Sequence, residues 1–134
     1  MLSIPKSKVI LILSGQNLDP ALITEKSGLK PDYEQNSSYK DLKGRPMPGK
    51  WQLNSRLSAF EELEQHILDI LKRISDNRQF FKDIAKDYTA KLYCTIEYSG
   101  ENTDGYRLSS RTLTILGSLG FELEVDTWKL ESKA

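Results

Sequence analysis

The sequence is poor in the residues that build most reactive sites. It holds one cysteine, Cys94, and one histidine, His66, among 134 residues. A single cysteine excludes an internal disulfide and any metal site made of several cysteines. The patterns GxSxG, HExxH, Cys-x-x-Cys and GxGxxG are all absent, so hydrolase, zinc-enzyme and dinucleotide-binding functions lose their usual support. We therefore expect no cofactor and no metal, and the balance of these absences is against an enzyme.

An excess of one charge is also missing, as is any long hydrophobic run. The 19 Lys and Arg residues balance 19 Asp and Glu residues, which argues against nucleic-acid and membrane-surface binding. The apolar run Val9–Leu13 is shorter than the roughly 7–15 residues of a signal-peptide core or the roughly 18 of a membrane span. We expect a cytoplasmic protein with no nucleic-acid or membrane partner.

What the chain does contain is typical of one globular domain. Hydrophobic residues make up 38% and charged residues 28% of the sequence, and a chain of this length is long enough for one hydrophobic core. We predict a single domain over residues 1–134, with frayed ends at 1–7 and 130–134.

Local patterns predict alternating strands and helices. Asp19-Pro20 before an apolar face and Gly28 after it predict a helix over 20–27. Two capping boxes, starting at Ser58 and Asp76, predict two consecutive helices, the first over about 59–74. The remaining predicted elements are strands at 9–13, 33–39, 51–54, 92–98 and 121–128 and a helix capped by Ser109.

These elements run in the order β-α-β-β-α-α-β-α-β. Strands and helices mixed in this way favour an α+β fold with a single mixed β-sheet and helices packed mainly on one face. Our preferred architecture is a ferredoxin-like variant. Ser14–Asn17 and Ser99–Asn102 share the pattern Ser-Gly-x-Asn after a strand, which indicates either two neighbouring parallel strands, a duplicated half, or a chance similarity.

Several short stretches, spread over most of residues 9–128, consist mainly of caps, turns and core positions. The stretches are Leu13–Gly15, Leu18–Pro20, Ile23-Thr24, Gly28–Pro31, Gly49–Ser55, Glu64–His66, Gly105–Ser109, Leu116–Gly120 and Leu123–Asp126. Together they resemble a known bacterial family, the domain of unknown function 4279. The resemblance implies a stand-alone cytosolic module of this fold and transfers no catalytic residue.

The segment before the third predicted strand is the main candidate for binding. Within residues 40–50 four basic side chains face one acidic residue, Asp41, and aromatic residues flank them. Arginine and aromatic side chains on a loop are typical of interaction surfaces, whereas a solvated connection is the alternative. The candidate binding residues are Tyr33, Tyr39, Lys43, Arg45, Lys50, Trp51 and His66.

Two functions from different classes fit these residues. The first is a non-enzymatic protein-interaction module, of immunity type or an adaptor, acting as a monomer or weak homodimer. The second is an enzyme or a protein that binds a small anionic ligand in a cleft near the 30–51 loop, with Arg45, Lys50 and Trp51 as ligand-binding residues and His66 as an acid or base. Trp51 shares its strand face with apolar Leu53, so we predict that its ring is at least half buried.

Three other features have simpler explanations. Gly44–Lys50 fits the start of a phosphate-binding loop, but Trp51 follows where that motif needs Ser or Thr. Cys94 falls on the same predicted strand face as apolar Leu92 and Ile96, which predicts a buried, unreactive thiol. Glu122, Glu124 and Asp126 share one strand face, which predicts a solvated outer surface.

Overall fold

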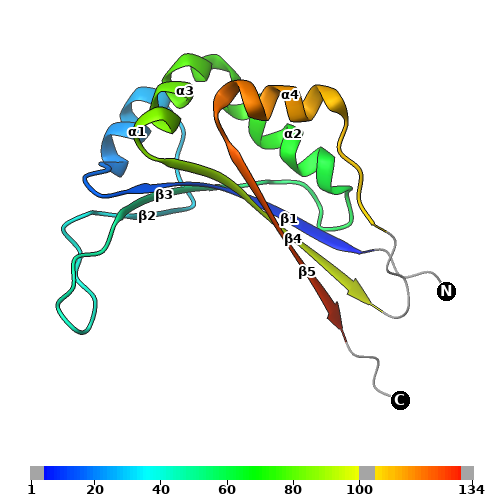
Figure 1. The fold of residues 1–134 in the computed structure, drawn as a ribbon, viewed down its shortest axis with the longest axis horizontal. Helices are drawn as coiled ribbons and strands as arrows, with labels where there is room; N and C mark the ends of the chain where they lie inside the picture. Colours follow the sequence, from blue (N-terminus) through cyan, green and yellow to red (C-terminus); the bar gives the residue numbers. More distant parts are fainter. Residues whose placement is uncertain (1–4, 100–104, 131–134) are drawn as a thin grey trace.

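A computed structural model describes residues 5–99 and 105–130 of the chain. Five strands form one mixed sheet in the order β2-β3-β1-β4-β5, and Figure 1 shows the helices on one side of it. The elements are β1 (Lys6–Gly15), α1 (Pro20–Ser27), β2 (Tyr33–Gln35), β3 (Gly49–Asn54), α2 (Leu63–Ile74), η1 (Ser75–Asn77), α3 (Arg78–Asp87), β4 (Thr89–Ser99), α4 (Ser110–Leu119) and β5 (Glu122–Leu130). The predicted α+β class with a single mixed sheet is confirmed.

The hydrophobic core lies between the sheet and the helices. Along β1, Val9, Leu11 and Leu13 are buried, while Ile10 and Ile12 on the other face are only half buried. The same alternation runs through β4, where Cys94 is among the buried residues. One face of the sheet is therefore covered by helices, and we call the other the open face.

The strand pairing differs from part of the expectation. β1 and β4 are neighbours, but they pair antiparallel, with Leu11 opposite Leu92. Only β4 and β5 run parallel, joined by α4 as a crossover helix. The prediction of parallel strands from the Ser-Gly-x-Asn similarity is thus wrong, and the ferredoxin-like variant is not confirmed. The second copy of that similarity, around 99–102, falls largely outside the described residues.

The helix ends follow the local signals in two helices and not in the other two. The Asp19 side chain accepts a hydrogen bond from the Ala21 N–H, and Gly28 closes α1 with φ +71°. Ser109 caps α4 by accepting from the Thr112 N–H. By contrast, α2 begins only at Leu63, and neither α2 nor α3 has a side-chain cap, so both predicted capping boxes are wrong.

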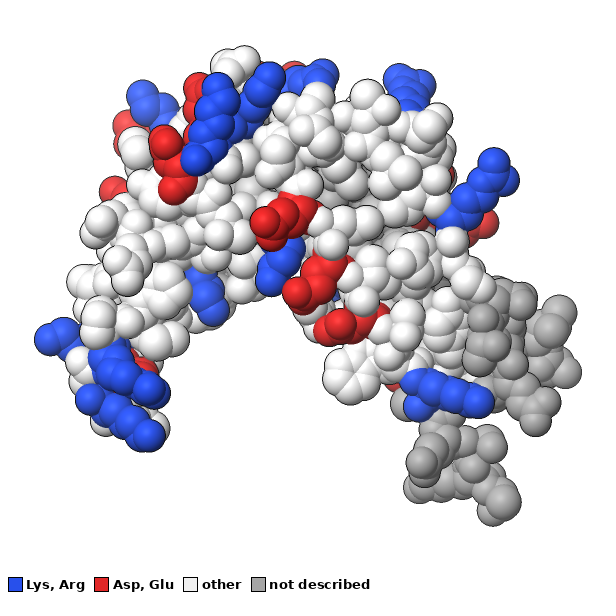
Figure 2. All heavy atoms as spheres, in the orientation of Figure 1, with Lys and Arg blue, Asp and Glu red and all other residues white. Residues whose placement is uncertain are grey.

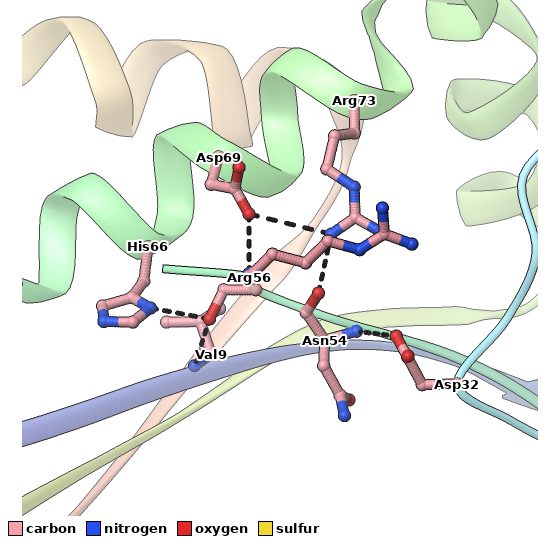
Figure 3. Close-up of polar contacts among 8 residues, drawn as sticks. Val9, Asp32, Asn54, Arg56, His66, Asp69 and Arg73 are labelled. Atoms are coloured by element: carbon pink, nitrogen blue, oxygen red, sulfur yellow. Dashed lines mark hydrogen bonds and ion pairs between the residues drawn. The ribbon is translucent and has the colours of Figure 1, made fainter. Parts of the chain in front are cut away.

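A network of polar contacts fixes the connection from β3 to α2 (Figure 3). The Arg56 N–H donates to Asp69 Oδ2 at 2.9 Å, and Arg73 donates to the Asn54 carbonyl at 2.7 Å. Arg73 and Asp69 also form an ion pair at 3.7 Å. These contacts tie Asn54 and Arg56, at the end of the family-like stretch 49–55, to α2. They therefore hold β3 against the helix layer.

The structure describes only part of the predicted frayed ends. Lys6 and Ser7 belong to β1 and Leu130 to β5, while the rest of the predicted frayed ends, apart from Pro5, lies outside the described residues.

Within residues 5–99 and 105–130, no helix has the length and apolar character needed to span a bilayer. In that same part of the chain, no group of three or more His, Cys, Asp or Glu side chains is placed to bind a metal ion.

Candidate functional site

The connection between β2 and β3 folds into a hairpin of its own. The Met47 N–H donates to the Tyr39 carbonyl at 2.9 Å, and the Asp41 N–H donates to the Arg45 carbonyl at 3.0 Å. Gly44 turns the chain with φ +75°, a left-handed conformation that glycine adopts at little cost. Figure 1 shows this segment projecting from the sheet, away from the helices. We call residues 39–47 the hairpin.

The Asp41 carboxylate holds the end of the hairpin in one conformation. Its Oδ1 accepts from the backbone N–H groups of Lys43 and Arg45, both at 2.9 Å, and its Oδ2 pairs with Arg45 Nε at 2.8 Å. The hydrogen bond from the Arg45 backbone is the main reason why the pKa of Asp41 is lowered. Three donors on one carboxylate therefore define the shape of the tip before any partner arrives.

The hairpin presents one fully exposed apolar residue together with exposed basic side chains and one exposed tyrosine. Leu42 is completely exposed, and Tyr39 is 58% exposed. Lys43 and Arg45 are also exposed. Figure 2 shows basic side chains gathered on this projection. We call Tyr39, Leu42, Lys43 and Arg45 the tip surface.

Trp51 lies in the core and not on the tip surface. Its side chain is 0% exposed, its Nε1 donates to Thr24 Oγ1 at 3.1 Å, and its ring lies 5.9 Å from that of Phe81. The prediction that the ring is at least half buried is confirmed. For the same reason Trp51 cannot contact a partner in this structure, so its place among the binding residues has to be corrected.

His66 is also removed from the hairpin. It lies on α2, 1% exposed, with Nδ1 at 2.7 Å from Ser55 Oγ. Ser55 Oγ also accepts from the Val9 N–H at 3.3 Å, so the serine connects the histidine ring to β1. Nε2 has no hydrogen-bond partner within the described residues. A ring so buried does not meet a solute, which argues against a role as acid or base.

Burial also governs the ionisation of His66 and Cys94. Loss of solvent lowers the pKa of His66, against the opposing influence of the Ser58 carbonyl and the Asp69 and Glu61 carboxylates. Burial raises the pKa of Cys94 to about 12. The thiol is therefore protonated at neutral pH, as its predicted burial implied.

Tyr33 and Lys50 occupy a second place, on β2 and β3 at the open face. Tyr33 is about half exposed and its hydroxyl donates to Gln35 Oε1 at 3.0 Å. Lys50 pairs in register with Gln35. The seven predicted residues are thus divided among the hairpin, the sheet and the core, and the structure brings only Tyr39, Lys43 and Arg45 together at the tip.

Hollows near the 30–51 loop do not match the predicted anionic cleft. One of about 370 Å³ is lined by residues between 33 and 39, and another of about 430 Å³ by residues of 21–34. Neither is lined by Arg45, Lys50 or Trp51. A larger hollow of about 710 Å³ lies elsewhere, between the start of α2 and residues 105–107.

Two features of the hairpin are not predicted from the sequence. Leu42 is one, because a single leucine among polar residues carries no periodic signal. Asp41 is the other, because composition shows it only as an opposing charge. The spacing of Asp41 and Gly44 is a recognisable turn signal, since an aspartate can bond to the backbone two residues on, and it could have identified the hairpin.

The fold and this site together define a small α+β domain with a one-sided helix layer and an open sheet face. A profile of the family described as "Domain of unknown function (DUF4279)" matches residues 5–130. The chain therefore belongs to the DUF4279 family, as the resemblance implied. Among curated proteins and solved structures, none matches the chain.

Proposed function

We propose that this chain is a non-enzymatic protein-interaction module that binds its partner through the tip surface. The observation that carries the proposal is the completely exposed Leu42 on a hairpin whose shape is fixed by Asp41. When a partner covers an exposed apolar side chain, removing that side chain from water stabilises the complex. A tip that is already ordered loses little conformational entropy on binding.

The surroundings of Leu42 indicate the chemistry of the partner. Lys43 and Arg45 are exposed, and Lys40 is exposed beside them. Charge complementarity then favours a partner surface with an apolar pocket for Leu42 and acidic side chains around it. Arginine and tyrosine are the residues that most often dominate binding energy at interfaces, which supports roles for Arg45 and Tyr39.

The proposal covers two kinds of interaction module, an immunity-type protein and an adaptor. The formal net charge of zero disfavours an inhibitor of a basic nuclease, which would gain association rate from a strong negative charge. A bacterial host, a cytoplasmic location, a monomer or weak homodimer, and a ferredoxin-like relationship belong to this proposal as further predictions.

The test compares partner capture by three forms of the chain. Leu42→Ser removes the apolar tip, and Leu113→Ser is the matched control because Leu113 is 50% exposed on α4. Proteins from a native lysate that are held by the wild type and the control, but not by Leu42→Ser, are identified, purified and titrated. We expect Leu42→Ser to weaken the purified complex at least tenfold. Equal affinities of all three forms for every captured protein would contradict the proposal.

A further inference from the structure

The sheet has two edges of very different length. β2, at one edge, has three residues, whereas β5, at the other, has nine. Within the described residues, β5 pairs only with β4. Figure 1 shows no helix or strand along its outer side. The outer backbone N–H and C=O groups of β5 are therefore available to another strand.

The side chains of β5 differ sharply between its two faces. Glu122, Glu124 and Asp126 lie on the open face, followed by Trp128, and Figure 2 shows acidic side chains gathered along this strand. Trp128 is 58% exposed. On the helix face, Leu123 and Val125 pack against the core but stay only partly buried. An incoming strand would meet three carboxylates on one face and an unfinished core on the other.

The neighbouring strand neutralises these carboxylates only in part. Lys91 on β4 lies 3.7 Å from Glu124, and Tyr93 donates a hydrogen bond to Asp126. Glu122 and Glu124 remain exposed. Three acidic residues against one basic residue, Lys129, leave β5 locally negative.

A second copy of the chain is a poor occupant of this edge. If two β5 strands paired antiparallel in one continuous sheet, residues on the same face would lie opposite one another. The acidic residues of one copy would then face the acidic residues or Trp128 of the other. Like charges directly opposite in a sheet are destabilising, so the edge disfavours its own pairing.

We propose that the β5 edge binds an extended segment of another protein in which basic and apolar residues alternate. The backbone of that segment would add a sixth strand to the sheet. Its basic side chains would lie beside Glu122, Glu124 and Asp126, and its apolar side chains would extend the core beside Leu123 and Val125. This inference stands on β5 alone and does not depend on the tip surface.

Synthetic peptides provide the direct test on the intact protein. The probe is a nine-residue capped peptide in which lysine and valine alternate. Two controls are a peptide of the same composition with the lysines and valines in separate blocks, and an alternating glutamate–valine peptide. We expect the alternating lysine peptide to bind at least tenfold more tightly than either control. Equal binding of all three peptides would overturn the proposal.

A backbone test separates strand addition from simple charge attraction. In a strand, successive N–H groups point to opposite sides, so methylating alternate nitrogens blocks one edge of the peptide and leaves the other free. Two such peptides, methylated at the odd or the even positions, have the same side chains. Strand addition predicts that one binds and the other does not, and that the bound one slows hydrogen exchange in β5. Equal binding, or unchanged exchange in β5, would contradict it.

Variants of the protein complete the design. Glu122→Lys with Glu124→Lys should reverse the preference toward the glutamate peptide, while Glu25→Lys on the exposed side of α1 should change nothing. If the reversed variant does not fold, Glu122→Gln with Glu124→Gln takes its place as a milder change. It should weaken binding of the lysine peptide at least fivefold. Leu42→Ser should leave peptide binding intact, which distinguishes this proposal from the one above. An unaltered preference in folded variants would overturn the inference.

Discussion

At the scale of single residues, Trp51 is the largest side chain in the part of the core that lies under α1 and α3. Its ring contacts Phe81, and its one polar atom bonds to Thr24. Replacing it by alanine leaves a cavity that the surrounding helices only partly fill. We expect Trp51→Ala to lower the free energy of unfolding by roughly 3–5 kcal/mol, the usual cost for a large buried aromatic residue.

Urea unfolding measures this cost, with Trp51→Phe as the control. Phenylalanine keeps ring packing and loses the bond to Thr24, so its effect should be clearly smaller. A neutral Trp51→Ala substitution combined with a loss of partner binding would show that the tryptophan acts at a surface, against the burial described here.

His66 makes the stability of the domain depend on pH. Burial lowers its pKa in the folded state, so the unfolded chain binds a proton at higher pH than the folded one. Its contribution is therefore fully present above the ordinary histidine pKa of about 6.5 and is lost as the pH falls below that value. We expect the urea concentration at the unfolding midpoint to decrease when the pH is lowered from about 7 to about 5.5.

The variant His66→Asn tests the assignment, since asparagine keeps a polar group near Ser55 without titrating in this range. Its urea midpoint should vary less between the same two pH values. If wild type and variant show the same pH dependence, groups other than His66 control it.

At the scale of elements, the junction of β3 with the loop before α1 depends on Gly49. A Cβ atom at this position would lie 2.1 Å from the Leu18 carbonyl oxygen, far closer than a non-bonded carbon and oxygen can approach. We expect Gly49→Ala to cost at least about 1–3 kcal/mol of unfolding free energy, as overpacked sites do.

Gly117 provides the matched comparison for this substitution. It lies within α4, and an added Cβ would meet no atom within 4 Å. Gly117→Ala should raise stability by up to about 1 kcal/mol because alanine favours a helix. Thermal melts of the two variants that moved in the same direction would contradict this account of Gly49.

The hairpin should respond locally when its central carboxylate is removed. Asp41→Ala deletes the acceptor of the Lys43 and Arg45 N–H groups, yet the segment is exposed and adds little to the core. We expect stability to change by no more than about 0.5 kcal/mol, while amide exchange at Lys43 and Arg45 becomes faster. Unchanged exchange at these amides would show that the backbone bonds alone hold the hairpin.

The start of α2 shows why some elements could be predicted and others not. The Ser58–Glu61 pattern is a sound local signal, but the Ala59 carbonyl accepts a hydrogen bond from the Ser7 N–H at 2.7 Å. This contact with the start of β1, beyond the residues that pair with β3, holds the segment outside the helix. In α1 the local signals at Asp19 and Gly28 give both helix ends correctly.

The order and direction of the strands are harder to predict from the sequence than the position of each strand. The alternation of Leu92, Cys94 and Ile96 was enough to place β4 and its buried face. Its direction relative to β1 depends on which strands come together in space, and a shared tetrapeptide carries no information about that. That is why the tetrapeptides could not predict the antiparallel pairing.

At the scale of the whole molecule, the candidate binding segment stays a prediction from composition. Of its residues, Tyr39, Lys43 and Arg45 are exposed. The burial of Trp51 follows from its alternation with Leu53 and not from composition, which by itself places Trp51 among the binding residues. Composition also cannot show which strand edge of the sheet is unpaired, because that depends on the order of all five strands.

The separation of charge across the open face has a consequence for how this neutral chain behaves in an electric field. The hairpin carries three basic residues against one acidic, and β5 carries the reverse, at opposite ends of the face (Figure 2). Together they contribute a dipole moment to a molecule without net charge. Near its isoelectric point of about 6.6, the protein should be retarded by both cation- and anion-exchange resins, presenting the hairpin to one and β5 to the other. Salt should release it from both, because screening acts on each end alike.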